Sequence, residues 1–217
     1  MTITVHTNPA FRTVGMIAVL NEPIANEPSL VSKYYTSAYY QVRHTEQQLG
    51  VTDVDALTLQ FMSPSWQAGN AAPYLGPNAV AVSWDNHRYI KYSSTLPLQS
   101  AYLAASCGDA HNLSATQTIP GYTSFPLMIG EWTLSPASVV ENDSPVWWIR
   151  DGTNDGFYKR WWAAQVRSYE TASAGWLFWS WKAELGDYRW SYKDAVARGI
   201  IATDPTDAWA INPCEDL

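Results

Sequence analysis

Five stretches of the chain are close to continuously hydrophobic, without alternation between apolar and polar positions. Strands that are buried on both faces have this pattern, and each stretch has the length of a strand. Segments with helical spacing lie between them. Strands that alternate with helices predict a parallel sheet built from βαβ units, which is an α/β fold. The predicted strands are residues 14–20, 56–62, 79–84, 126–130 and 175–181.

The segments between these strands carry apolar residues at helical spacing. Residues 29–49 place Tyr35, Tyr39 and Val42 on one face. Gly50 follows directly, in the position of a helix-terminating glycine. The predicted helices are residues 29–49, 98–106 and 154–171, with another after Trp190.

The composition of the chain limits what it can bind. Its 217 residues can bury a sizeable core, and no repeat or Pro/Gly-rich linker divides them, so we predict one domain over residues 1–217. A net charge of −7 argues against a nucleic-acid partner. No apolar run is long enough to cross a membrane. The 12 Trp and 13 Tyr fill much of the core, but such side chains also stack on sugar rings.

Two cysteines, Cys107 and Cys214, are far apart in sequence and lack metal-ligand spacing. They suit either one long-range disulfide in a secreted protein or two buried thiols. Residues 1–6 have no basic stretch followed by an apolar one, so no signal peptide is expected in this chain. The sequence also has no nucleotide-binding glycine motif and no His/Cys cluster. We predict no cofactor and no metal.

Two glutamates stand at predicted strand ends, Glu22 after residues 14–20 and Glu131 after residues 126–130. A single glutamate there often marks only where a strand leaves the core. Two of them at the C-terminal ends of parallel strands are what retaining glycoside hydrolysis needs. Asn21 can hydrogen-bond a sugar 2-hydroxyl, so we predict Glu22 as the acid/base and Glu131 as the nucleophile.

Polar and aromatic residues follow two other predicted strands. His87 and Tyr89 are two positions apart in an extended segment and would point to the same side. There they could orient the nucleophilic carboxylate or bind sugar hydroxyls, although a solvated histidine and a packed tyrosine are alternatives. Trp179 could form the floor of the subsite that holds the cleaved sugar. Residues 26–28 repeat the Asn-Glu-Pro tripeptide without a preceding apolar run, and we predict that they begin a helix.

Together these segments resemble glycoside hydrolase family 5, and most of all its fungal glucan endo-1,6-β-glucosidases, which are related to exo-1,3-β-glucanases. The resemblance runs over nearly the whole chain. It rests on residues 21–23 (Asn-Glu-Pro), 85–89 (Asp-Asn-His-Arg-Tyr), 129–132 (Ile-Gly-Glu-Trp), 175–182 (Gly-Trp-Leu-Phe-Trp-Ser-Trp-Lys) and 186–196 (Gly-Asp-Tyr-Arg-Trp-Ser-Tyr-Lys-Asp-Ala-Val).

The resemblance implies a secreted, metal-independent, retaining hydrolase of β-1,6-glucan with a (β/α)8 barrel. Members of the family carry a signal peptide and three further strand–helix units before the Asn-Glu-Pro strand, so this chain is expected to form strands four to eight of an incomplete barrel. It also implies the following roles: Glu22 as proton donor, Glu131 as nucleophile, Asn21, His87, Tyr89 and Trp179 as substrate contacts, and a Cys107–Cys214 bridge.

The expected partner is a β-glucan polysaccharide or oligosaccharide of the fungal cell wall. An open half-barrel would expose unpaired strand edges, so self-association and little or no activity of this chain alone are expected. The alternatives are an exo-1,3-β-glucanase, a non-catalytic glucan-binding remnant and a product without a stable fold.

Overall fold

A computed structural model describes residues 1–24, 27–66, 69–93, 98–117, 125–137, 145–204 and 206–215. The chain forms two compact units. The first unit consists of residues 1–86 and 116–128, and the second unit of residues 87–115 and 129–217.

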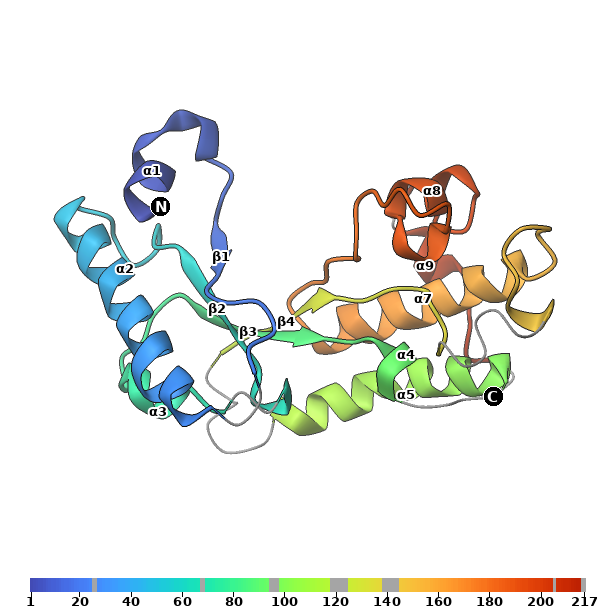
Figure 1. The fold of residues 1–217 in the computed structure, drawn as a ribbon, viewed down its shortest axis with the longest axis horizontal. Coiled ribbons are helices and arrows are strands. Elements are labelled where there is room, and N and C mark those ends of the chain that lie inside the picture. The colour runs from blue at the N-terminus through green and yellow to red at the C-terminus, as the bar shows by residue number, and fades with distance from the viewer. Residues whose placement is uncertain are drawn as a thin grey trace. The chain divides into compact units, whose positions relative to one another are not determined.

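Four strands form one sheet in the order β1-β2-β3-β4 (Figure 1). β2 is parallel to both of its neighbours. β2 and β3 are buried at nearly every position, so both faces of each strand are covered. The bounds are β1 Met16–Ala18, β2 Thr58–Met62, β3 Val82–His87 and β4 Leu127–Glu131.

The third strand is shifted from the predicted residues 79–84. It begins only after Ala81, whose φ of 48° lies outside the extended region. It then continues through Asp85, Asn86 and His87, all of which are buried. The predicted strand ends too early because buried polar residues do not continue the apolar run.

The predicted fifth strand, residues 175–181, is wrong as a strand of the sheet. Only Trp176 pairs with Ile129, in a single parallel bridge. The Trp179 N–H still donates to the Trp132 carbonyl, and the Ser180 N–H then donates to the Trp190 carbonyl at 2.8 Å. A run of apolar residues cannot distinguish a strand with two covered faces from one with an open face. Here the exposed side chains are Leu177, Trp179 and Trp181.

The longest helical stretch of the first unit begins near residue 28. The Glu27 carboxylate accepts hydrogen bonds from the Ser29 N–H and hydroxyl at the start of the helix, as predicted for Glu27 and Pro28, whereas Asn26 lies outside the described residues. The predicted helix over residues 29–49 is confirmed as a π-helical segment that runs directly into α2. The bounds are α1 Thr2–Thr7, η1 Pro9–Phe11, η2 Leu30–Tyr35, α2 Thr36–Gln48, η3 Pro64–Trp66 and α3 Ala72–Leu75.

Most of the remaining helices belong to the second unit. The predicted helix over residues 154–171 is confirmed by α7, whereas the one over residues 98–106 was predicted too short. It continues to Gln117 because Ser106, Asp109 and Leu113 are buried on one face, and this packing outweighs the low helix propensity of Gly108. The bounds are α4 Ile90–Ser93, α5 Gln99–Gln117, η4 Pro145–Trp147, α7 Asp155–Ala172, η5 Tyr188–Trp190, α8 Tyr192–Ala197 and α9 Asp207–Ala210.

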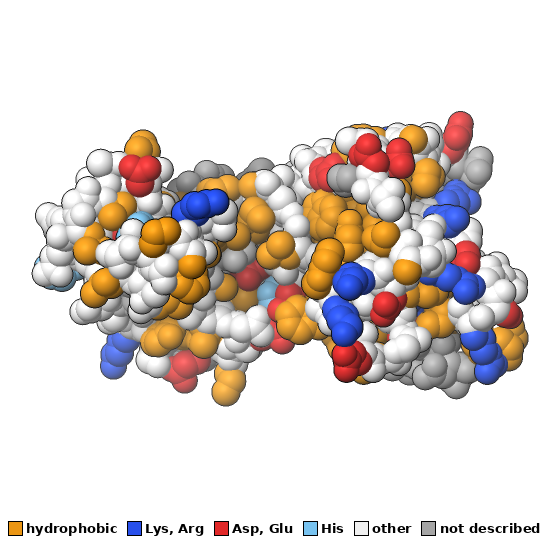
Figure 2. Space-filling view, turned by 90° about the horizontal axis from the view of Figure 1, so that it is seen from above, with side chains coloured by type: hydrophobic (Ala, Val, Ile, Leu, Met, Phe, Trp, Pro, Cys, Tyr) orange, Lys and Arg blue, Asp and Glu red, His pale blue; other side chains and the backbone are white. Residues whose placement is uncertain are grey.

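Aromatic side chains form much of the core of the second unit. Trp132 is fully buried and meets Tyr169, Trp176 and Phe178 edge-on, at ring-centroid distances of 5.0–5.3 Å. Such edge-to-face pairs add to the free energy of burial. Figure 2 shows that hydrophobic side chains also reach the surface, between charged ones.

A disulfide joins Cys107 on α5 to Cys214 near the C-terminus, with the two Cα atoms 6.0 Å apart. This is the pairing that the family resemblance implied, and it closes a long loop of the second unit. None of the helices in the described part of the chain has the length and hydrophobicity that a membrane span requires.

Candidate active site

Glu131 ends β4 and meets two side chains from the end of β3. The Tyr89 hydroxyl donates a hydrogen bond of 2.6 Å to Glu131 Oε2. His87 Nδ1 lies 3.5 Å from the same oxygen. The Arg88 N–H donates to the Glu131 carbonyl at 2.8 Å, which keeps the two chain segments in register. Because alternate residues of an extended chain point to the same side, His87 and Tyr89 both reach the carboxylate.

The surroundings of this carboxylate are largely closed to water. The side chain of His87 is 1% exposed and that of Glu131 is 12% exposed. The hydrogen bond from Tyr89 has the short length of one made to a charged acceptor. In such a low-dielectric site it also fixes the direction of the carboxylate more firmly than it would in water.

The corner that carries Tyr89 is braced on both sides. Arg88 forms an ion pair with Asp109 on α5, with a distance of 3.0 Å from Nε to Oδ2, and Asp109 is buried. The Tyr89 ring packs against the rings of Tyr92 and Trp190 at centroid distances of 5.7 and 6.1 Å. The position of the Tyr89 hydroxyl is thus set by both an ion pair and ring packing.

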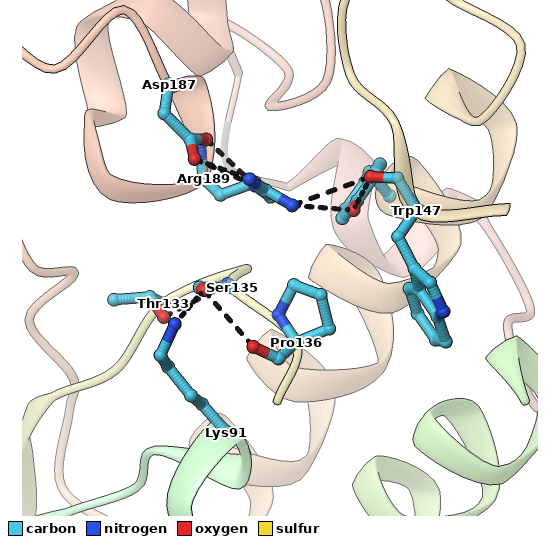
Figure 3. Close-up of polar contacts among 8 residues, drawn as sticks. Lys91, Thr133, Ser135, Pro136, Trp147, Asp187 and Arg189 are labelled. Atoms are coloured by element: carbon cyan, nitrogen blue, oxygen red, sulfur yellow. Dashed lines mark hydrogen bonds and ion pairs between the residues drawn. The ribbon is translucent and has the colours of Figure 1, made fainter. Parts of the chain in front are cut away.

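A buried arginine holds the segment that carries Trp190 (Figure 3). The Arg189 guanidinium donates to both Asp187 oxygens, at 2.9 and 2.6 Å, and a third nitrogen lies 3.5 Å from the Trp147 carbonyl. Burial alone would lower the pKa of Arg189, but the hydrogen-bonded Asp187 carboxylate and Tyr158 outweigh it and raise that pKa. The Arg189 carbonyl also accepts from the Leu134 N–H, just after β4.

Lys91 makes a second link around the same segment (Figure 3). Its Nζ donates to the Ser135 hydroxyl at 3.0 Å and lies 5.3 Å from the centre of the Trp190 ring. The sequence pattern predicts no role for Lys91, Arg189 or Trp190. The only sequence signal for Arg189 is its position two residues after Asp187 in an aromatic-rich segment. That signal does not reveal its contact with Trp147, which lies 42 positions away in the chain.

Asn21 and Glu22 lie in the first unit, shortly after β1, and both are exposed. Glu22 has a φ of 41°. A non-glycine residue in this region costs on the order of 1–3 kcal/mol of backbone strain. A turn residue without a further role would favour glycine or asparagine here. A glutamate in this conformation is a candidate for a functional residue.

Trp179 belongs to the second unit, and its N–H donates to the Trp132 carbonyl at 2.9 Å, one residue beyond Glu131. Its side chain is 49% exposed. The peptide bond that follows it is cis. Of the predicted site residues, the second unit thus joins His87 and Tyr89 directly to Glu131, and it leaves Trp179 about half exposed.

No protein-family model matches the chain. It is 40% identical over 99% of its length to the glucan endo-1,6-beta-glucosidase B of Emericella nidulans, and 39% identical to a probable glucan endo-1,6-beta-glucosidase B of Neosartorya fischeri. A probable glucan 1,3-beta-glucosidase A of Aspergillus clavatus is 26% identical. The chain spans about half the length of the curated relatives it matches.

Among solved structures, a rutinosidase from Aspergillus niger matches 92% of this chain and 54% of its own, with a TM-score of 0.57 and 16% identity. This likeness shows the fold alone. The predicted α/β fold, with the arrangement of an incomplete (β/α) barrel, is thereby confirmed. The predicted resemblance is confirmed as well: the chain is homologous to fungal glucan endo-1,6-β-glucosidases over nearly its whole length.

Proposed function

We propose that this chain carries the catalytic end of a retaining hydrolase of β-1,6-glucan, with Glu131 as nucleophile and Glu22 as acid/base. The observation that carries the proposal is the Glu131 carboxylate, which ends β4, receives the Tyr89 hydroxyl and lies beside His87. The relative from Emericella nidulans, 40% identical and named for endo-1,6-β-glucosidase activity, supports the choice of substrate.

The proposed reaction has two steps. In the first, the Glu131 carboxylate attacks the anomeric carbon while Glu22 gives its proton to the leaving oxygen, so that the glycosidic bond breaks and a glycosyl ester forms on Glu131. In the second, the Glu22 carboxylate takes a proton from water, and the water oxygen displaces Glu131. This chemistry requires carboxyl groups roughly 5–5.5 Å apart.

Other predicted residues have supporting roles in this proposal. Tyr89 and His87 hold the Glu131 carboxylate in the direction of attack. The exposed ring of Trp179 stacks on the sugar that is cleaved, and Asn21 binds its 2-hydroxyl. The two carboxyl groups perform the chemistry, so we propose no cofactor.

We also propose that the protein acts outside the cell, on cell-wall glucan. The Cys107–Cys214 disulfide supports this location, because such bonds persist in oxidising compartments. Its relatives are glucan hydrolases of fungi. Recovery of the oxidised protein from culture medium would agree with the proposal, and its retention inside cells with free thiols would contradict it.

The function is tested with two proteins. One is the 217-residue chain alone, and the other is a completed chain, in which the unmatched part of the Emericella nidulans relative precedes it. Both are incubated with pustulan, a β-1,6-glucan, and with laminarin, a β-1,3-glucan. We expect the completed chain to release sugars faster from pustulan, with the first product in the β form by NMR. We expect the chain alone to remain near background.

Each other outcome has a definite meaning. Preference for laminarin would indicate hydrolysis of β-1,3-glucan, the activity for which the more distant 1,3-β-glucosidase relative is named. Binding of glucan without turnover by the completed chain would favour a non-catalytic glucan-binding protein. A first product in the α form would contradict the retaining mechanism. Equal rates for the two proteins would contradict the expectation that this chain needs the rest of a barrel.

A further inference from the structure

Trp209 is an exposed tryptophan of α9, a short helix that packs against α7 in the second unit (Figure 1). The exposed fraction of this residue is 48%. A single exposed aromatic side chain is common on protein surfaces and needs no explanation by itself. Trp209 differs from such residues because charged side chains of α7 hold its indole ring at two places.

The first of these contacts is at the polar edge of the ring. The Trp209 Nε1–H donates to Glu170 Oε2 at 2.5 Å, and the Trp176 Nε1–H donates to the other carboxylate oxygen at 3.2 Å. Trp176 in turn packs against the fully buried Trp132, with ring centroids 5.3 Å apart. The Glu170 carboxylate therefore ties the Trp209 ring to the core of the second unit.

The second contact is on a face of the ring. The Arg167 guanidinium lies over the Trp209 ring, 5.1 Å from its centre, which is a cation–π contact. The same guanidinium donates to the Ile211 carbonyl at 2.8 Å, and this bond fixes its position. One face and the Nε1 edge of the ring are thus occupied by charged groups, while about half of the residue stays in contact with water.

Other contacts already hold the C-terminal segment on the second unit. Arg160 donates to the Pro213 carbonyl at 3.2 Å. The disulfide with Cys107 then holds Cys214. A tryptophan that served only as a further anchor would be expected to bury more of its ring. A firmly held indole with its polar edge satisfied can instead offer apolar surface to a ligand, and the C–H face of a β-linked glucose ring fits such a surface.

The polar groups beside the ring also suit a sugar. Glu170 is exposed, and each of its carboxylate oxygens has a further acceptor site for a hydroxyl group. Arg167 is partly exposed and carries several N–H donors. A single aromatic ring binds one glucose unit weakly, so this arrangement suits a polymer that the same protein also holds at a second place. The substrate proposed above is such a polymer.

We propose that Trp209, Glu170 and Arg167 form a non-catalytic site for β-1,6-glucan on the surface of the second unit. A glucose unit stacks on the ring face opposite Arg167, and its hydroxyl groups bind the Glu170 carboxylate and the guanidinium. The site keeps the polymer on the protein and takes no part in bond cleavage. The choice of β-1,6-glucan rests on the function proposed above, but binding is measured without turnover.

The first test is affinity electrophoresis of the 217-residue chain in gels that contain pustulan or laminarin. We expect Trp209→Leu to weaken retention by pustulan about fivefold to tenfold, because leucine is apolar but has no flat face. Trp209→Tyr keeps a ring and should retain most of the binding. Equal retention of the two variants would overturn the proposal, and so would retention that depends on Trp209 with laminarin but not with pustulan.

Tyr74→Leu is the matched control, since Tyr74 is an exposed aromatic residue of the first unit with the same accessible fraction, 48%. Its retention should equal that of the unchanged chain. The melting temperature and thiol titration of each variant check that the fold and the Cys107–Cys214 bond persist. An equal loss of retention in Tyr74→Leu and Trp209→Leu would show that the binding is not specific to this site.

The second test is kinetic and uses the completed chain. Trp209→Leu should raise KM on pustulan about threefold to tenfold and leave kcat unchanged, because only the holding of the polymer is weakened. Hydrolysis of an aryl glucoside, which needs only the catalytic site, should not change. A lower kcat on the aryl glucoside would show that Trp209 supports the catalytic fold, and would overturn the proposal.

The two tests together separate this site from the proposed hydrolase. Retention by pustulan that depends on Trp209, without any hydrolysis by the completed chain, would support the binding site and contradict the hydrolase. Hydrolysis of pustulan with unchanged retention and unchanged KM in Trp209→Leu would contradict the binding site and leave the hydrolase in place.

Discussion

Glu22 follows β1 and Glu131 ends β4, but the surroundings of the two carboxylates differ. Glu131 receives a short hydrogen bond from Tyr89, lies beside the buried His87, and has a side chain that is 12% exposed. Glu22 is exposed and sits in a turn with a φ of 41°. One carboxylate is fixed and shielded from water, whereas the other stands on a strained turn in the first unit.

The difference matches the two roles that retaining hydrolysis assigns to its carboxyl groups. A nucleophile has to stay ionised and aimed at one carbon, and hydrogen bonds to the charged form achieve this. An acid/base has to lose and regain a proton and to activate a water molecule, which requires access to solvent. Different surroundings of two carboxyl groups are thus the basis on which their roles can be told apart.

The largest effect is expected for Glu131→Gln in the completed chain. The amide cannot form the glycosyl ester, so the rate on pustulan should fall by about 10⁴-fold or more, the size of loss seen when a nucleophile is removed. Initial rates and mass spectrometry of the trapped intermediate check this. Glu184→Gln is the control, because Glu184 is an exposed glutamate of the same unit that pairs with Lys182. A variant that keeps a tenth of the activity would remove Glu131 from the proposed role.

Glu22→Gln should affect the two steps unequally. Loss of a general acid costs on the order of 10²–10⁴-fold with a sugar leaving group, while an aryl glucoside with a good leaving group needs no proton. We therefore expect a large loss on pustulan and a small one in the first step with the aryl substrate. Glu27→Gln is the control, since Glu27 belongs to the second Asn-Glu-Pro and binds Ser29. Equal losses on both substrates would contradict the division of roles.

The structure also shows which features a sequence can predict. β2 and the helix α7 were predicted well, because continuous burial or helical spacing leaves a clear pattern. The apolar run over residues 175–181 predicts a full strand, but a run of apolar residues does not show whether the second face of the segment is covered. Whether the second face is covered depends on which other segment of the protein packs against it, and no local sequence pattern contains this information.

The same limit applies to the candidate site. His87 and Tyr89 were predicted to share a side because their spacing of two is a local property. The brace formed by Arg189 with the Trp147 carbonyl, and the bond from Lys91 to Ser135, join residues more than 40 positions apart. Only the folded chain brings such partners together, so the residues that brace this corner were missed, whereas the placement of His87 and Tyr89 beside Glu131 was predicted.

A third prediction concerns the unit that holds Glu131, since both cysteines belong to it. Replacement of Cys107 and Cys214 by serine removes a link across 107 positions, and the free energy of unfolding should fall by about 4 kcal/mol. Urea denaturation of the oxidised and the substituted chain measures this. Thiol titration of denatured, unreduced protein should find no free thiol; two free thiols would show that the bond does not form.

Tyr89→Phe tests the hydrogen bond that distinguishes the two glutamates. Removal of one hydrogen bond to a charged group costs about 1.5–3 kcal/mol, so kcat on pustulan should fall about 10–100-fold in the completed chain, with little change in KM. The ring packing against Tyr92 and Trp190 remains, so the melting temperature should hardly move.

Tyr40→Phe is the control for this substitution. Its hydroxyl donates to the neutral Leu75 carbonyl at 3.2 Å in the first unit, so its loss should leave kcat unchanged. If Tyr89→Phe instead raised KM without lowering kcat, the hydroxyl would act on the bound sugar and not on the nucleophile. The contrast between Glu131 and Glu22 would then rest on burial alone, because the hydrogen bond would have no part in aiming the carboxylate.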